Sequence, residues 1–271
     1  MKAKRVFYPV ITPPPAASAS LPLTRKVRPA LVPLRSQCIE QKVFRDYIRE
    51  KIVFDVERGL SSVAWICRPR KQGRWPGVLC CHGDGPGKDP LVGLLDGKPC
   101  LEYHKLVAVR LAQLGYVTIT PDRRGFGERS AIPYFPPPAR YRADLEEFYR
   151  RTRHASLLAL DILDGVRTLD VLMEYADAKR IGCMGVYDGA TVAAGVAALD
   201  KRVKTVSLAC FGGDLELCRR ISPRPVQIQI AKAGPPPPRG PLPDNVSRHV
   251  FDGVLELDFS ALTTWLERHL K

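Results

Sequence analysis

The sequence predicts one α/β domain with a doubly wound, mostly parallel sheet and helices on both faces. Its 271 residues are long for a single core but within the range of α/β domains. Short apolar runs, typical of buried strands, alternate with segments of helical length from about residue 77 to the end of the chain. Such strand–helix units imply parallel strands joined by right-handed crossovers. Ligands of sheets of this kind bind beyond the carboxyl ends of the strands.

The sheet is expected to begin with an antiparallel pair of strands, residues 47–55 and 61–68, joined at Gly59. Residues 77–81 form the next strand, which stops in a glycine-rich loop, as a buried parallel strand does. The remaining strands are predicted at residues 116–120, 180–184, 203–210, 226–231 and 248–251. Helices are predicted at residues 103–114, 156–176, 190–199 and 259–270.

Two segments interrupt this alternation. Residues 1–40 form a proline-rich extension that carries seven basic residues and no acidic one before Glu40. Prolines at this density exclude a regular helix or a central strand, so the expected domain comprises residues 41–271. Within it, residues 130–152 combine four prolines with five aromatic residues, which predicts a lid-like loop excursion at one end of the sheet.

Composition restricts the classes of function. The formal net charge is +14, but half of the excess lies in the extension and the rest is dispersed, so we expect no specific nucleic-acid partner. No apolar run reaches eighteen residues, which predicts that no segment spans a membrane. The eight cysteines form no CxxC pair and no cluster with histidine at zinc-ligand spacing. We therefore expect reduced core thiols, a cytoplasmic protein, and no metal or other cofactor.

Four segments, taken in order, resemble the α/β-hydrolase superfamily, and most closely its branch of acetyl xylan esterases and dienelactone hydrolases. Residues 82–85 (HGDG) resemble the family's oxyanion loop, and residues 114–127 match its stretch GY-strand-PD-x-RG-x-G. Residues 180–185 resemble the strand that leads to the nucleophile, and residues 265–270 resemble the terminal helix. The resemblance covers roughly residues 47–271 and implies the α/β-hydrolase fold.

The resemblance also implies hydrolysis of carboxylic esters by a Ser-His-Asp triad. In this family the serine lies between two glycines on a strained turn from a strand to a helix. This chain keeps both glycines, Gly185 and Gly189, but has Tyr187 at the nucleophile position. A tyrosine is a poor substitute because its phenol titrates near pKa ~10 and its ring fills the space that an acyl group would occupy.

The other two triad positions are replaced as well. Leu255 stands where the family has its histidine, and the loop after residues 226–231 has no carboxylate before Asp244. The pocket positions that the resemblance retains are His82, Gly83, Asp84, Gly85, Gly185 and Gly189.

Neither the remaining histidines nor the neighbouring nucleophiles restore a triad. Only His82 and His104 could approach the pocket, and His82 belongs to the glycine-rich loop, which it supports. Asp188 is an alternative nucleophile, as aspartate is in haloalkane-dehalogenase-like members, but that chemistry also needs a histidine to activate water. Cys81 is excluded as a partner of His82, because adjacent residues on a strand point to opposite faces.

Three hypotheses follow. The first is a non-catalytic homologue whose former active-site pocket can hold a small-molecule ligand. The second is a serine-independent carboxylic-ester hydrolase with a rearranged site that uses Tyr187 or Asp188. The third is a binding module whose basic arm, residues 1–40, engages an anionic partner.

Overall fold

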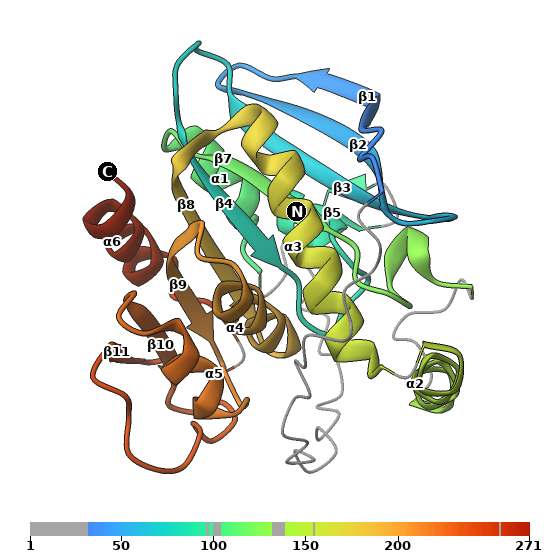
Figure 1. The fold of residues 1–271 in the computed structure, drawn as a ribbon. Helices are drawn as coiled ribbons and strands as arrows, with labels where there is room; N and C mark the ends of the chain where they lie inside the picture. Colours follow the sequence, from blue (N-terminus) through green and yellow to red (C-terminus); the bar gives the residue numbers. More distant parts are fainter. Residues whose placement is uncertain (1–31, 96–97, 100–103, 132–138, 154, 255) are drawn as a thin grey trace.

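A nine-stranded sheet forms the centre of the molecule, with strands in the order β1-β2-β3-β7-β4-β8-β9-β10-β11 (Figure 1). The computed structural model describes residues 32–95, 98–99, 104–131, 139–153, 155–254 and 256–271. The strands are β1 (Gln37–Val43), β2 (Tyr47–Glu57), β3 (Leu60–Pro69), β4 (Pro76–Cys81), β7 (Val117–Pro121), β8 (Asp177–Val186), β9 (Val203–Ala209), β10 (Val226–Ala231) and β11 (Val246–Phe251). Strands β5 (Leu94–Leu95) and β6 (Lys98–Pro99) form a separate pair. Neighbours are antiparallel from β1 to β7 and parallel from β7 to β11, which confirms the predicted mostly parallel sheet.

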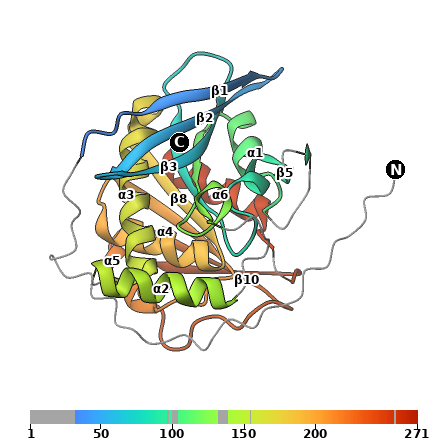
Figure 2. The same ribbon diagram turned by 90° about the vertical axis from the view of Figure 1, so that its right-hand side faces the viewer.

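Helices cover both faces of the sheet and divide the core into two layers (Figure 2). Helices α3 (Leu157–Tyr175), α4 (Asp188–Leu199) and α5 (Leu215–Ile221) lie on one face, and helices α1 (Val107–Gln113) and α6 (Phe259–Leu270) lie on the other. In β4 the side chains alternate between the layers: Leu79 and Cys81 belong to the first, and Val78 and Cys80 to the second. The predicted doubly wound arrangement is therefore confirmed. Among the described helices, none has the length and apolar character needed to cross a membrane.

Helices α3 and α6 begin where the sequence predicts because each has a capping side chain. The Ser156 hydroxyl accepts the Ala159 N–H at 3.1 Å. The Asp258 carboxylate accepts the N–H groups of Ser260 and Ala261 at 3.0 and 3.1 Å. These bonds satisfy donors that the first turn of a helix leaves without partners.

Three elements differ from the sequence prediction. Strand β1 begins at Gln37, inside the segment expected to be irregular, and all of its residues are exposed, so no apolar alternation marks it. Helix α2 (Ala139–Arg153) occupies more than half of the segment predicted as a loop, because the prolines that suggested a loop all precede it. Helix α5, capped by the Asp214 side chain, lies where we expected only a connection.

A buried ion-pair network holds the loop after β4 to the loop after β7. The Lys88 Nζ atom lies 2.8 Å from Asp122 Oδ2 and 2.5 Å from Glu128 Oε1, and the side chains of Lys88 and Asp122 are 1% and 0% exposed. The Asp122 carboxylate also accepts the backbone N–H groups of Lys88 and Glu128. Burial opposes the charge of Lys88, but the carboxylates of Asp122 and Asp89 raise its pKa above the usual value.

Removing the cation from this network is expected to destabilise the fold. In Lys88→Met the Asp122 carboxylate stays buried without its counter-ion, so we expect the free energy of unfolding to fall by about 3–5 kcal/mol in urea denaturation. Lys201→Met, at an exposed position, is the matched control. Equal stability of the two variants would contradict a structural role for the network.

Candidate functional site

Tyr187 occupies a strained turn between β8 and α4. Its backbone angles are φ 58° and ψ −128°, a conformation that bulky residues rarely adopt. Backbone hydrogen bonds hold the turn: the Tyr187 N–H donates to Ala209 O at 3.0 Å, and Tyr187 O accepts from the N–H groups of Ala190 at 2.8 Å and Thr191 at 3.4 Å. The structure thus forms the turn that the glycine spacing predicts, with tyrosine at its apex.

The two glycines on either side of Tyr187 allow the backbone to pass very close to its neighbours. A Cβ atom on Gly185 would overlap the backbone of Gly189. A Cβ atom on Gly189 would overlap the carbonyl oxygens of Cys81 and His82 at the end of β4. The predicted pocket positions from the two loops are therefore brought together, with backbone packed directly on backbone.

His82 supports the loop after β4 and cannot accept a further proton. Its Nε2 atom accepts the Arg123 N–H at 3.0 Å, so the ring proton is on Nδ1, which donates to Gly83 O at 2.7 Å. The side chain is fully buried. Burial and the nearby charge of Arg123 hold the pKa of His82 well below its usual value. The ring is therefore neutral, with its one lone pair in use.

His104 has a similar structural role. Its Nε2 atom accepts the backbone N–H of Gly83 at 3.1 Å, which uses the lone pair of the neutral ring. Burial, with a contribution from the charge of Arg123, lowers the pKa of His104 to about 3. The two histidines that the sequence places near the pocket thus both position the loop, and neither can serve as a general base there.

Two carboxylates and two guanidinium groups meet beside the turn. Arg142, from α2, places Nη1 at 3.1 Å from Asp84 Oδ1 and Nη2 at 3.3 Å from Asp188 Oδ2. Arg123, from the loop after β7, places Nη2 at 3.5 Å and 3.9 Å from the same two oxygens. Both guanidinium groups also lie over the ring of Phe126, at 4.5 Å for Arg123 and 5.2 Å for Arg142. Helix α2 is therefore joined to both loops of the site.

The charges in this cluster separate the pKa values of the two carboxylates. Burial raises the pKa of Asp84, and the negative charge of Asp188 adds to this effect. For Asp188 burial acts in the same direction, but Arg123 and Arg142 outweigh it and lower its pKa. Asp188 is thus an ionised carboxylate bound by two cations. Such binding reduces its reactivity as a nucleophile.

The Tyr187 hydroxyl is less acidic than that of a free tyrosine. Burial, with smaller contributions from Cys210, Asp84 and Asp188, raises the pKa of Tyr187 to about 12. A phenolate is therefore a very minor species at neutral pH. Cys210 follows β9 and has a positive φ of 51°, so a second non-glycine residue near the turn has a strained backbone.

The remaining predicted positions are only partly described. Leu255 lies outside the described residues. Its neighbour Glu256 accepts a hydrogen bond from the Cys210 thiol through its carbonyl oxygen, at 3.7 Å, so this segment reaches the carboxyl end of β9. The Glu256 carboxylate pairs with Lys105 at 2.8 Å. Glu256, the residue after the family's histidine position, thus lies beside Cys210 at the end of β9.

Two of the other histidines lie away from the turn. His249 pairs with Asp258 at 2.8 Å, and His269 packs on Trp265 with ring centroids 4.3 Å apart. His154 is outside the described residues. Sequence reasoning did not identify Arg123, Arg142 or Cys210, because no motif indicates which residues of distant segments face the turn.

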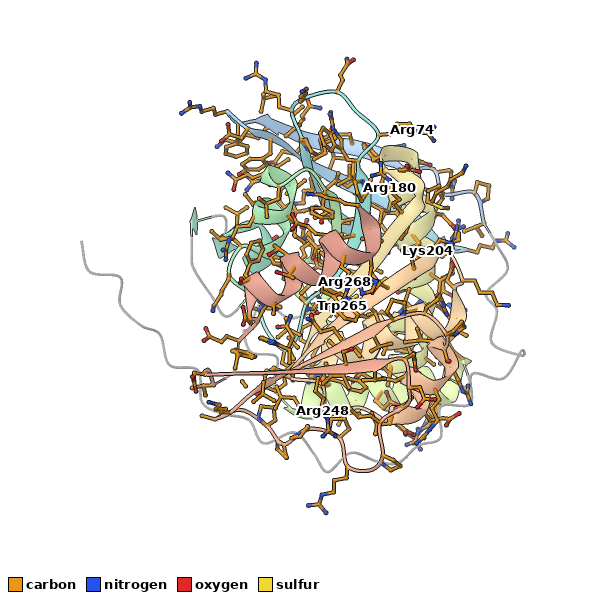
Figure 3. All side chains as sticks on the ribbon, turned by 90° about the vertical axis from the view of Figure 1, so that its left-hand side faces the viewer. Arg74, Arg180, Lys204, Arg248, Trp265 and Arg268 are labelled. Carbon is orange, nitrogen blue, oxygen red and sulfur yellow. The ribbon has the colours of Figure 1, made fainter. Side chains whose placement is uncertain are left out.

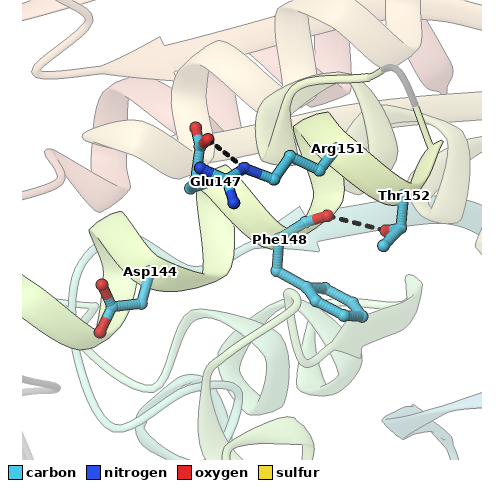
Figure 4. A pocket seen from close by; sticks show the side chains of 5 residues that line it. All are labelled: Asp144, Glu147, Phe148, Arg151 and Thr152. Atoms are coloured by element: carbon cyan, nitrogen blue, oxygen red, sulfur yellow. Dashed lines mark hydrogen bonds and ion pairs between the residues drawn. The ribbon is translucent and has the colours of Figure 1, made fainter.

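A shallow depression on α2 is separate from this site (Figure 4). Its volume is about 320 Å³, and all of its lining residues come from one helix: Asp144, Glu147, Phe148, Arg151 and Thr152. Glu147 and Arg151 are already paired with each other at 2.5 Å. The depression contains none of the residues of the strained turn, so we do not assign the site to it.

Comparisons with known proteins bear on the fold of the chain. No family model matches it. The Bacillus subtilis (strain 168) protein YtaP, named as a hydrolase, is 26% identical over 186 residues, which cover 66% of this chain and 58% of YtaP. The chain thus spans less than two thirds of the length of this curated relative.

Solved structures of esterases share the fold. A Bacteroides fragilis protein designated an acetyl xylan esterase superimposes with a TM-score of 0.70 and 15% identity, over 90% of this chain and 83% of that one. Acetyl xylan esterase 1 from Thermoanaerobacterium sp. superimposes with a TM-score of 0.63 and 16% identity, over 87% of this chain and 88% of its own. The chain therefore has the α/β-hydrolase fold.

The close approach at the turn predicts that even one methyl group is destabilising there. In Gly189→Ala the new Cβ must displace backbone, so we expect unfolding in urea to require about 1–3 kcal/mol less free energy than in the parent. Gly212→Ala is the matched control, because a Cβ there has no atom within 4 Å. A loss of the same size in the control would show that the effect of Gly189→Ala does not come from the close backbone contact at residue 189.

The contacts of Arg142 predict that α2 depends on them for its docking. In Arg142→Ala we expect amide hydrogen exchange in α2 to be about fivefold faster, a local loss of ~1 kcal/mol for two partly exposed ion pairs. Arg150→Ala removes an ion pair to Glu147 within the same helix and should leave the exchange nearly unchanged. Equal acceleration in both variants would argue against a connection between α2 and the turn.

Proposed function

We propose that this α/β-hydrolase-fold protein is a non-catalytic relative of the esterases, and that its strained turn forms part of a binding site for a small molecule. The observation that carries the proposal is the state of the nucleophile and base positions. The turn presents Tyr187, with its pKa raised to about 12, and the two pocket histidines have already used their lone pairs.

Ester hydrolysis needs a group that attacks the carbonyl and a base that takes the proton from it. Tyr187 retains its proton at neutral pH, and neither His82 nor His104 can remove it. In proteins without a triad, backbone donors and substrate binding alone can leave a small residual rate over water. A slow background rate is therefore compatible with the proposal.

The charged groups beside the turn favour a polar ligand. Arg142 is about one third exposed and lies between Asp84 and Asp188, so a ligand that reaches the turn meets these groups first. The Phe126 ring is only 2% exposed, so it supports the two guanidinium groups and offers little surface to a ligand. A ligand with a polar or charged group matches the exposed part of this cluster.

A rearranged hydrolase is the second candidate, and the ionised state of Asp188 favours it. A carboxylate nucleophile must be charged, and the lowered pKa of Asp188 meets that condition. The two bound arginines and the neutral, engaged histidines count against it. The basic arm at residues 1–40 stays a prediction, since residues 1–31 are outside the described part of the chain.

Hydrolysis of p-nitrophenyl acetate distinguishes these candidates. We expect the parent, Tyr187→Phe and Asp188→Asn to share one rate, close to that of buffer, because His82 and His104 have already used their lone pairs and cannot act as the base. Tyr187→Ser restores the family's nucleophile without its base and should behave in the same way.

The control for the aspartate variant is Asp252→Asn, at a residue that is 89% exposed. A parent rate far above buffer that disappears in Tyr187→Phe or Asp188→Asn, but not in Asp252→Asn, would overturn the proposal and establish a rearranged active site.

A further inference from the structure

A groove of about 400 Å³ lies between α6 and the last two strands of the sheet, β10 and β11. It contains none of the residues of the strained turn. Figure 3 shows the side chains on this part of the molecule, with Arg248, Trp265 and Arg268 labelled. We propose that this groove binds a small organic phosphate, with Arg248 and Arg268 as the residues that hold the phosphate group.

The charge of the groove is the first argument. Arg248 comes from β11 and Arg268 from α6, so the two cations approach the groove from different elements. Both are exposed, and neither forms an ion pair within the described part of the chain. Guanidinium groups bind phosphate oxygens with paired hydrogen bonds, which makes arginine the preferred residue for such ligands.

The one carboxylate in the groove does not neutralise these arginines. Asp258 Oδ2 lies 2.8 Å from His249 Nε2, and Oδ1 accepts two backbone N–H groups at the start of α6. Burial opposes ionisation of this carboxylate, but the hydrogen bond from His249 and those from the backbone lower its pKa. Asp258 is therefore fully occupied by its own partners, and the two arginine charges remain available to a ligand.

The floor of the groove is held rigidly. The Trp265 indole N–H donates to Thr205 Oγ1 at 2.7 Å, and its side chain is 8% exposed. Gln227 Oε1 accepts from the Ser207 hydroxyl at 2.7 Å, and Gln227 Nε2 donates to Ala261 O at 3.3 Å. A floor fixed in this way needs little reordering when a ligand binds, which favours affinity.

The size of the groove favours a small molecule over a long polyanion. A volume of about 400 Å³ lies within the range of small-molecule pockets. The hydroxyls of Ser260 and Thr264 also line the groove and offer further donors to a phosphate. Lys204, labelled in Figure 3, is exposed on β9 and adds positive charge to this side of the molecule without lining the groove.

Calorimetric titration with phenyl phosphate at low salt tests the proposal on the full chain. We expect Arg248→Gln and Arg268→Gln each to weaken binding by about 10- to 100-fold, because each removes charge-assisted hydrogen bonds. Lys204→Gln removes the same charge outside the groove and should change the affinity less than about twofold. Inorganic phosphate should compete with phenyl phosphate, and phenol should not bind.

Three results would overturn the proposal. The first is no binding of phenyl phosphate, and the second is a loss of affinity in Lys204→Gln as large as that in the arginine variants. The third is that an oligonucleotide binds more tightly than phenyl phosphate and that all three variants weaken its binding equally. The last two would assign the affinity to diffuse surface charge. We expect all three variants to fold, because neither arginine forms an ion pair within the described part of the chain. Circular dichroism of each variant checks this. Tyr187→Phe should leave phosphate binding unchanged, so this test is independent of the proposed function of the turn.

Discussion

The closeness of three backbone segments is the constraint on which the site depends. The chain leaves β8, turns at Tyr187 and enters α4 with Gly185 packed on the backbone of Gly189 and Gly189 packed on the end of β4, so neither position has room for a Cβ atom. This contact holds Tyr187 in a strained conformation, which costs of order 1–3 kcal/mol. Such a conformation persists only where the surrounding structure fixes the turn. The fold therefore keeps the strained geometry that a nucleophile would need, although the residue at the apex is a tyrosine.

Buried ion pairs also fix the loop after β7 beside the turn. Arg124 donates to both oxygens of Asp164 on α3 at 2.8 Å and lies 3.0 Å from Glu57 on β2, so the loop after β7 is tied to a helix and a distant strand. The adjacent Arg123 is thereby placed against the turn, where its backbone N–H fixes His82 and its guanidinium group faces Asp188. The electrostatics of the site and the packing of the sheet are thus consequences of the same loop.

The parts of this structure that sequence predicts are those with a local physical signal. Apolar runs predicted the central strands, capping side chains fix the first turns of α3 and α6, and the glycine spacing predicted the turn at Tyr187. Strand β1 has no buried face and so no alternation, and α2 follows prolines that suggested a loop. The partners of Arg142 lie 58 and 46 residues away in the chain, and no pattern along the sequence indicates such contacts.

The alternation of β4 between two core layers has a consequence for the site. Consecutive side chains of β4 face opposite layers of the core. Leu79 and Cys81 therefore face α3 and α4, and Val78 and Cys80 face α1 and α6. His82 follows the last residue of this strand, and its ring accepts the Arg123 N–H. A slip of one residue in β4 would exchange the two layers and displace His82 from the Arg123 amide. The register of β4 therefore fixes both the packing of the two core layers and the position of the loop that begins at His82.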